Sequence, residues 1–88
     1  MNFKKSTRSG KKYMVVVNGK TIHFGDIKMQ QFKDTTGLGL YSHLDHLDET
    51  RRKSYLARAK GIKNKRGELT WKDVNSANYY SVKFLWSG

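Results

Sequence analysis

Two β-branched and aromatic runs joined by Asn-Gly constrain the fold of this chain more than any other feature. The runs cover residues 13–17 and 20–24, and the dipeptide lies between them. A type I′ turn needs positive φ at both central residues, and Asn-Gly adopts it readily. The pattern therefore predicts a β-hairpin with Ile22 and Phe24 on one face and Thr21 and His23 on the other. Because an isolated hairpin is marginal in water, its apolar face must pack on another element.

Two capping signals predict helices further along the chain. Asp48 is a suitable N-cap for a helix over residues 49–60, whose acidic start and basic end suit the helix dipole. Ser76 is a suitable N-cap for a last helix over residues 77–86. The aromatic side chains of this last helix are expected to cover the hairpin, and a partner subunit is the alternative surface for them.

These elements predict an α+β fold: the hairpin packed against two helices, in a single small domain at residues 13–88. A third short strand is a candidate near residues 69–71, and Asp26 is a candidate cap for a short helix ending at Lys33. Residues 1–12 are polar and basic, so we expect a flexible basic arm there. The expected core is Val15, Val17, Ile22, Phe24, Phe32, Tyr55, Leu56, Tyr80, Phe84 and Leu85.

Positive charge is the strongest functional signal. The net charge is +11 in 88 residues, whereas a small domain typically carries a magnitude of about 2–8. Thirteen of the 18 basic residues fall in two clusters: Lys4, Lys5, Arg8, Lys11 and Lys12, then Arg51, Arg52, Lys53, Arg58, Lys60, Lys63, Lys65 and Arg66. A surface of this kind predicts an anionic partner, and these thirteen residues are the candidate polyanion-binding or partner-binding set.

Several function classes find no support in the sequence. The chain has no Cys, so it has neither disulfides nor thiolate metal sites. Its apolar runs fall short of the roughly 18 residues that a membrane span requires. No nucleophile elbow and no phosphate-binding glycine loop is present. We therefore expect a protein that is not an enzyme and needs no cofactor.

One cluster nevertheless suggests a metal ion. His43, Asp45 and His46 lie within four residues, and imidazole and carboxylate groups are metal ligands. A small metal-dependent nuclease is the least favoured hypothesis, because no Cys completes a closed site and Asp48 could not serve both as a ligand and as the helix cap. The competing interpretation is a segment leading into the following helix, with polar side chains that satisfy free N–H groups.

Nucleic acid is the polyanion with the best electrostatic support. Lys and Arg neutralise phosphates and release counterions, which gives affinity that depends on salt and not on sequence. No zinc finger, RNP segment or basic zipper is present. The sequence thus predicts binding to the backbone and shape of a nucleic acid and not to its base sequence.

Five segments together resemble a group of small basic proteins of double-stranded DNA viruses, found in nucleocytoplasmic large DNA viruses and tailed phages. They are Lys11–Tyr13, Val17–Lys20, Ile22–Asp26, Arg51–Arg58 and Tyr79–Trp86. Members of that group usually carry His after the arginine of the Tyr-x-x-Arg segment, where this chain has Ala59.

The resemblance implies a structural, virion-associated protein and names no chemistry. On this basis we expect a minor capsid or cementing component of the virion that binds acidic capsid surfaces and the viral genome. The alternative is a sequence-independent nucleic-acid-binding protein of a virus or its host.

Overall fold

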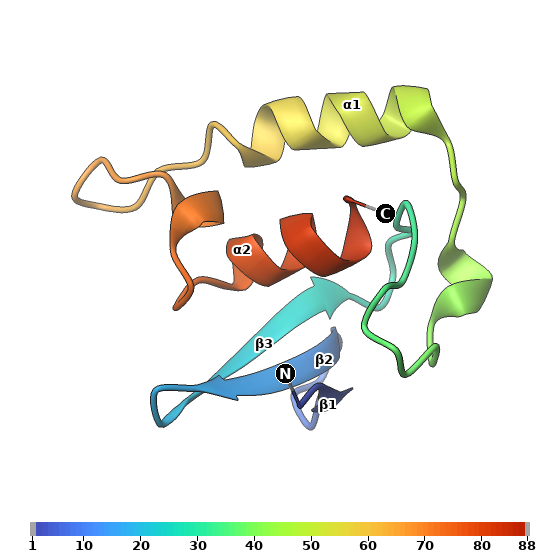
Figure 1. Cartoon of the computed structure of the whole chain (residues 1–88), viewed down its shortest axis with the longest axis horizontal. Coiled ribbons are helices and arrows are strands. Elements are labelled where there is room, and N and C mark those ends of the chain that lie inside the picture. The colour runs from blue at the N-terminus through green and yellow to red at the C-terminus, as the bar shows by residue number, and fades with distance from the viewer. Residues whose placement is uncertain (1, 88) are drawn as a thin grey trace.

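The computed structural model describes residues 2–87 and has an α+β fold, as the sequence predicts. Three antiparallel strands form one sheet in the order β1-β2-β3, and α2 lies between this sheet and α1 (Figure 1). The elements are β1 (Lys4–Lys5), β2 (Lys11–Val17), β3 (Lys20–Asp26), α1 (Glu49–Ala59) and α2 (Ala77–Tyr80). Two 3₁₀ turns, Ser42–Leu44 and Thr70–Lys72, and a π-helical turn, Ser81–Leu85, complete them.

The predicted hairpin is confirmed. Asn18 and Gly19 have φ of 51° and 75°, the signs that a type I′ turn requires. Cross-strand pairs run from Val17 opposite Lys20, through Tyr13 opposite Phe24, to Lys11 opposite Asp26. The turn therefore sets a register that brings Tyr13, Val15, Ile22 and Phe24 onto one buried face.

The third strand comes from the N-terminus, so the predicted strand near residues 69–71 is wrong. Lys4 pairs with Met14 and Lys5 with Tyr13, which adds β1 to the sheet edge. Near residue 69 the chain turns instead, because Asn64 Oδ1 accepts the N–H groups of both Arg66 and Glu68 at 2.9 and 3.0 Å. Leu69 then makes only a single bridge to Lys63.

The N-terminal segment also differs from the predicted arm of residues 1–12. Lys11 and Lys12 begin β2, and β1 pairs with that strand. Phe3 packs edge-on against Phe24 and Phe84, with ring centroids 5.6 and 4.6 Å apart. The packing of Phe3 and the pairing of β1 with the edge of β2 together attach this segment to the domain.

Both helix caps are confirmed. Asp48 Oδ1 accepts the N–H groups of Thr50 and Arg51 at 2.9 and 3.2 Å at the start of α1. Ser76 Oγ accepts the N–H of Asn78 at 3.2 Å at the start of α2. Each side chain satisfies backbone donors that the first helical turn leaves without partners.

The predicted short helix after Asp26 is wrong. Asp26 Oδ1 accepts the N–H of Lys28 at 2.9 Å and closes a turn. Beyond it, the N–H of Gln31 bonds to Leu44 O and that of Lys33 to Leu85 O. Carbonyl groups distant in sequence thus take the donors that a local helix would have used.

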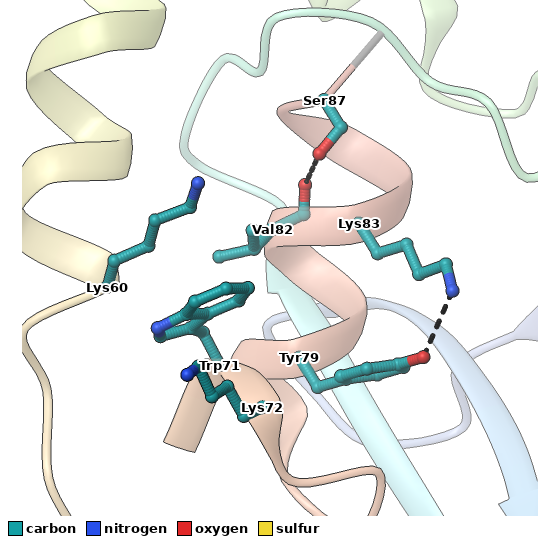
Figure 2. A pocket seen from close by; sticks show the side chains of 7 residues that line it. All are labelled: Lys60, Trp71, Lys72, Tyr79, Val82, Lys83 and Ser87. Atoms are coloured by element: carbon teal, nitrogen blue, oxygen red, sulfur yellow. Dashed lines mark hydrogen bonds between the residues drawn. The ribbon is translucent and has the colours of Figure 1, made fainter. Parts of the chain in front are cut away.

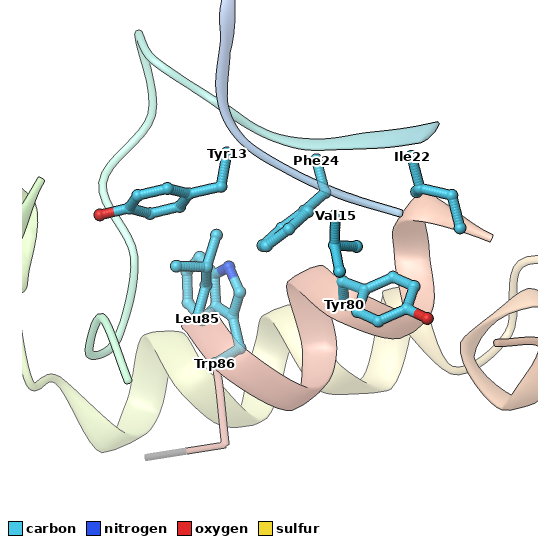
Figure 3. Packing of buried hydrophobic residues seen from close by; sticks show 7 residues of the cluster. All are labelled: Tyr13, Val15, Ile22, Phe24, Tyr80, Leu85 and Trp86. Atoms are coloured by element: carbon cyan, nitrogen blue, oxygen red, sulfur yellow. The ribbon is translucent and has the colours of Figure 1, made fainter. Parts of the chain in front are cut away.

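The core lies between the sheet and the C-terminal helix (Figure 3). Its buried members are Tyr13, Val15, Ile22, Phe24, Tyr80, Leu85 and Trp86. Five residues of the predicted core, Val17, Phe32, Tyr55, Leu56 and Phe84, pack around it only partly buried. The prediction did not include Tyr13 and Trp86. Trp86 stacks on Tyr55 with centroids 3.9 Å apart and so joins α1 to the core.

Candidate polyanion interface

The fold places the two basic clusters on opposite sides of the molecule. The first lies along β1, the β1–β2 connection and the start of β2, and the second lies along α1 and the loop that follows it (Figure 1). All thirteen candidate residues are exposed except Lys11 and Arg52, which are half-buried, and Lys12, which is buried. Within residues 2–87 a single ion pair involves them, Arg52 with Glu49 at 3.0 Å. Most of the positive charge thus faces solvent without a neighbouring carboxylate.

Lys12 does not belong to this surface, so its assignment to the polyanion-binding set is wrong. Its side chain is 1% exposed, and Nζ donates to Met29 O at 2.7 Å and to Gln31 Oε1. Burial lowers the pKa of Lys12, while nearby carboxylates including Asp26 oppose the shift. Gly25, which has no side chain, leaves room for the Lys12 alkyl chain, since a Cβ there would lie 3.1 Å from Lys12 Cδ.

Arg52 has a structural role in the fold. Its Nε donates to Trp86 O at 2.9 Å and Nη2 to Ser87 O at 3.2 Å. The guanidinium carbon lies 5.2 Å from the centroid of the Phe32 ring. Because these contacts and Glu49 occupy the guanidinium, Arg52 fastens α1 to the C-terminal segment and has few donors left for a partner.

A groove of about 430 Å³ lies between the end of α1, the Thr70–Lys72 turn and the C-terminal helix (Figure 2). Its lining consists of Lys60, Trp71, Lys72, Tyr79, Val82, Lys83 and Ser87. None of these is acidic, although Glu68 and Asp73 line a neighbouring depression. The groove therefore combines three cationic side chains with two aromatic rings.

The ammonium groups in the groove lie against the aromatic rings. Lys60 Nζ and Lys72 Nζ are 4.9 and 5.4 Å from the Trp71 centroid. Lys83 Nζ is 5.3 Å from the Tyr79 centroid and donates to its hydroxyl at 3.1 Å. These distances fall within the range of cation–π attraction, about 6 Å.

A half-buried amide side chain, that of Asn78, holds the walls of the groove together. Asn78 Nδ2 donates to Ala59 O and to Thr70 Oγ1, both at 2.9 Å. It thereby ties α2 to the end of α1 and to the turn that carries Trp71. The spacing of the walls is thus set by the protein before any ligand binds.

The sequence alone does not reveal this groove. Lys72 and Lys83 lie outside both basic clusters. One local signal was available: Tyr79 and Lys83 are four residues apart and share a helix face. The approach of Lys60 to Trp71 depends on how α1 packs, so no pattern of neighbouring residues in the sequence indicates it.

The candidate metal ligands have other partners. Asp45 Oδ1 accepts from Gln31 Nε2 at 2.7 Å and from the N–H of Asp34 at 2.9 Å. His46 Nδ1 accepts the N–H of Asp48 at 2.9 Å, and burial lowers the pKa of His46. His43 lies beside the ring of Tyr41, with centroids 6.2 Å apart. Across residues 2–87, no three potential donor side chains converge on one point.

Comparison with known proteins gives one partial match. Residues 1–36 are similar to a family described as "Family of unknown function (DUF5754)". The matched part contains the three strands and the segment after them, and excludes α1, α2 and the groove. No curated protein and no solved structure matches this chain. In the part of the chain that the structure describes, no helix has the length and apolar character needed to cross a membrane.

Proposed function

We propose that this protein is a non-enzymatic polyanion-binding protein that contacts nucleic-acid backbones without reading their sequence. The observation that carries the proposal is the exposed positive charge, which has almost no carboxylate partners among residues 2–87. With a net charge of +11 on so small a domain, the basic side chains repel one another until an anion lies against them. Backbone binding supplies that anion, and its affinity comes from the release of counterions.

The two-sided distribution of charge favours a second, more specific role. Lys4, Lys5 and Arg8 lie on the sheet side, whereas Arg58, Lys63 and Lys65 lie on the α1 side or in the loop beyond it (Figure 1). A molecule that is cationic on opposite sides can join two anionic surfaces. We therefore propose that the chain is a minor capsid or cementing component of a DNA virus particle, placed between acidic capsid protein and the genome. The resemblance to small basic virion proteins supports the same role.

Salt dependence tests the proposal of polyanion binding. Affinity for a short DNA duplex is measured by fluorescence anisotropy between about 50 and 200 mM salt. We expect log affinity to fall linearly with log salt, with a slope of about −0.9 for each phosphate contacted. Absence of binding at low salt, or a flat salt dependence, would refute it.

Matched triple variants separate the two sides of the protein. One replaces Lys4, Lys5 and Arg8 with Gln, and the other replaces Arg58, Lys63 and Lys65 with Gln. If both faces bind DNA, each triple variant reduces the slope by up to about 2.7. If one face instead binds protein, only one variant changes the slope. The other variant should then lose binding to an acidic shell protein, which a pull-down from disrupted particles measures.

The virion role has its own test. Purified particles are analysed by mass spectrometry, and the protein is expected in them at a fixed ratio to the major capsid protein. Its absence from particles would remove the virion role and leave polyanion binding to be judged on the salt experiment.

A further inference from the structure

We propose that the groove around Trp71 is a base-stacking subsite for single-stranded nucleic acid. This inference rests on the proposed polyanion binding and names the ligand class of one part of that surface. In it, the Trp71 indole stacks on an unpaired base, and the ammonium groups of Lys60 and Lys72 contact the flanking phosphates.

The position of Trp71 supports stacking. The indole is half-buried, and its exposed part faces a groove that also contains the Tyr79 ring. Lys60 approaches it from α1 and Lys72 from the adjacent turn (Figure 2). Proteins that bind single strands without sequence preference combine these parts, aromatic faces for bases and cationic side chains for phosphates.

The chemistry of the lining favours nucleic acid over an acidic peptide. Carboxylates would satisfy the lysines equally well, yet they offer no flat ring for Trp71. A nucleotide supplies both an anion and an aromatic face within one unit, so it complements the whole groove. In addition, the ammonium groups of Lys60 and Lys72 lie against the Trp71 indole in the free protein. A phosphate that binds either ammonium group draws it away from the indole, and the ring surface is then free for a base.

Unpaired bases suit this site better than a duplex. In double-stranded DNA the base faces are already stacked on one another, so a side chain on the protein surface can reach only phosphates and groove edges. In a single strand each base presents a face that can stack on an aromatic ring. The contacts of Asn78 with the walls hold the groove ready for such a strand.

The test compares two single strands of equal charge. One is a thymidine oligomer of about 12 nucleotides and the other an abasic oligomer of the same length. We expect the thymidine oligomer to bind roughly 5- to 150-fold more tightly, the range for one stacked base. Trp71→Ala should remove most of that difference, and Trp71→Phe should retain most of it. Lys28→Gln serves as a control on an exposed lysine outside the groove.

Tryptophan fluorescence of the unaltered protein gives a second readout that needs no variant. Trp86 is only 8% exposed, so quenching by a bound strand reports on Trp71. The thymidine oligomer should quench the emission, whereas the abasic oligomer and a poly-glutamate peptide should not.

Three results would overturn the subsite: equal affinity for the two oligomers, a difference that Trp71→Ala does not reduce, or equal quenching by the peptide. Failure of the wider proposal is a distinct result, since then neither oligomer nor the duplex binds at low salt.

Discussion

Replacing Tyr13 with Phe tests how the sheet is joined to the loop that follows it. Tyr13 is fully buried, and its hydroxyl donates to Asp34 Oδ2 while accepting the N–H of Leu40 at 3.1 Å. Phenylalanine keeps the ring and its edge-on contact with Tyr41, at a centroid distance of 5.4 Å. The substitution therefore removes hydrogen bonds with little change in packing.

The structure sets the size of the expected effect. A hydrogen bond to a charged group contributes about 1.5–3 kcal/mol. The second bond, from the neutral N–H of an exposed residue, contributes less. We expect Tyr13→Phe to lower the free energy of unfolding by about 2 kcal/mol. For a domain of this size the total is roughly 4–13 kcal/mol, so the loss is a substantial fraction.

Urea unfolding followed by tryptophan fluorescence measures this change. With an m-value of about 1.5 kcal/mol/M, the midpoint should fall by about 1–2 M. Tyr79→Phe is the matched control, because the hydroxyl of Tyr79 bonds, within residues 2–87, only to the exposed Lys83. This control should change stability by less than about 0.5 kcal/mol. A Tyr13→Phe midpoint equal to that of the control would refute the reasoning.

The same hydroxyl gives a pH dependence with a definite sign. Burial, aided by the Asp34 hydrogen bond, raises the pKa of Tyr13 from 10.0 to about 12. Because the folded-state pKa exceeds the unfolded value, this stabilisation is complete below pH 10 and is lost as the pH rises towards 12. Burial also raises the pKa of Tyr55 and Tyr80, so Tyr13→Phe should reduce the alkaline loss without abolishing it.

Three further substitutions test local features of the fold. Asp48→Ala should lower stability by about 1 kcal/mol through loss of the helix cap, whereas Asp48→Asn should stay within a few tenths, as measured by circular dichroism during urea unfolding. Gly25→Ala should lower the melting temperature more than Gly67→Ala does. Both glycines have positive φ, but only at Gly25 would the new Cβ meet side chains, the nearest atom at 3.0 Å. Arg52→Gln should destabilise by about 1–3 kcal/mol while Lys53→Gln stays within about 0.5, and equal effects in urea unfolding would contradict the structural role of Arg52.

Local interactions explain which parts of the fold could be predicted. The Asn18–Gly19 turn fixes the hairpin register, and Asp48 and Ser76 begin their helices by bonding N–H groups two or three residues away. The prediction after Asp26 failed for a related reason. A capping side chain closes a turn equally well, and whether a helix follows depends on distant acceptors such as Leu85 O.

The basic surface could be predicted in composition but not in arrangement. Ten of the thirteen selected residues are exposed, as expected of charged side chains, and Lys11 and Arg52 are half-buried. The assignment of Lys12 to the exposed surface was wrong because the segment around Met29 and Gln31, 17 and 19 residues further along the chain, covers its side chain. The Trp71 groove was missed because its walls come from separate elements.

By itself, the sequence determined the strong positive charge, the hairpin and the starts of both helices, because each depends on composition or on residues within a few positions. Only the tertiary structure decided that β1 would join the sheet, that Lys12 would be buried and that Lys60 would meet Trp71. Such contacts form when distant segments bury apolar surface together. Arg52, for example, bonds to the carbonyl of Trp86, 34 residues away. The polarity of a residue indicates that it needs partners, and the packing of the whole chain selects which partners it finds.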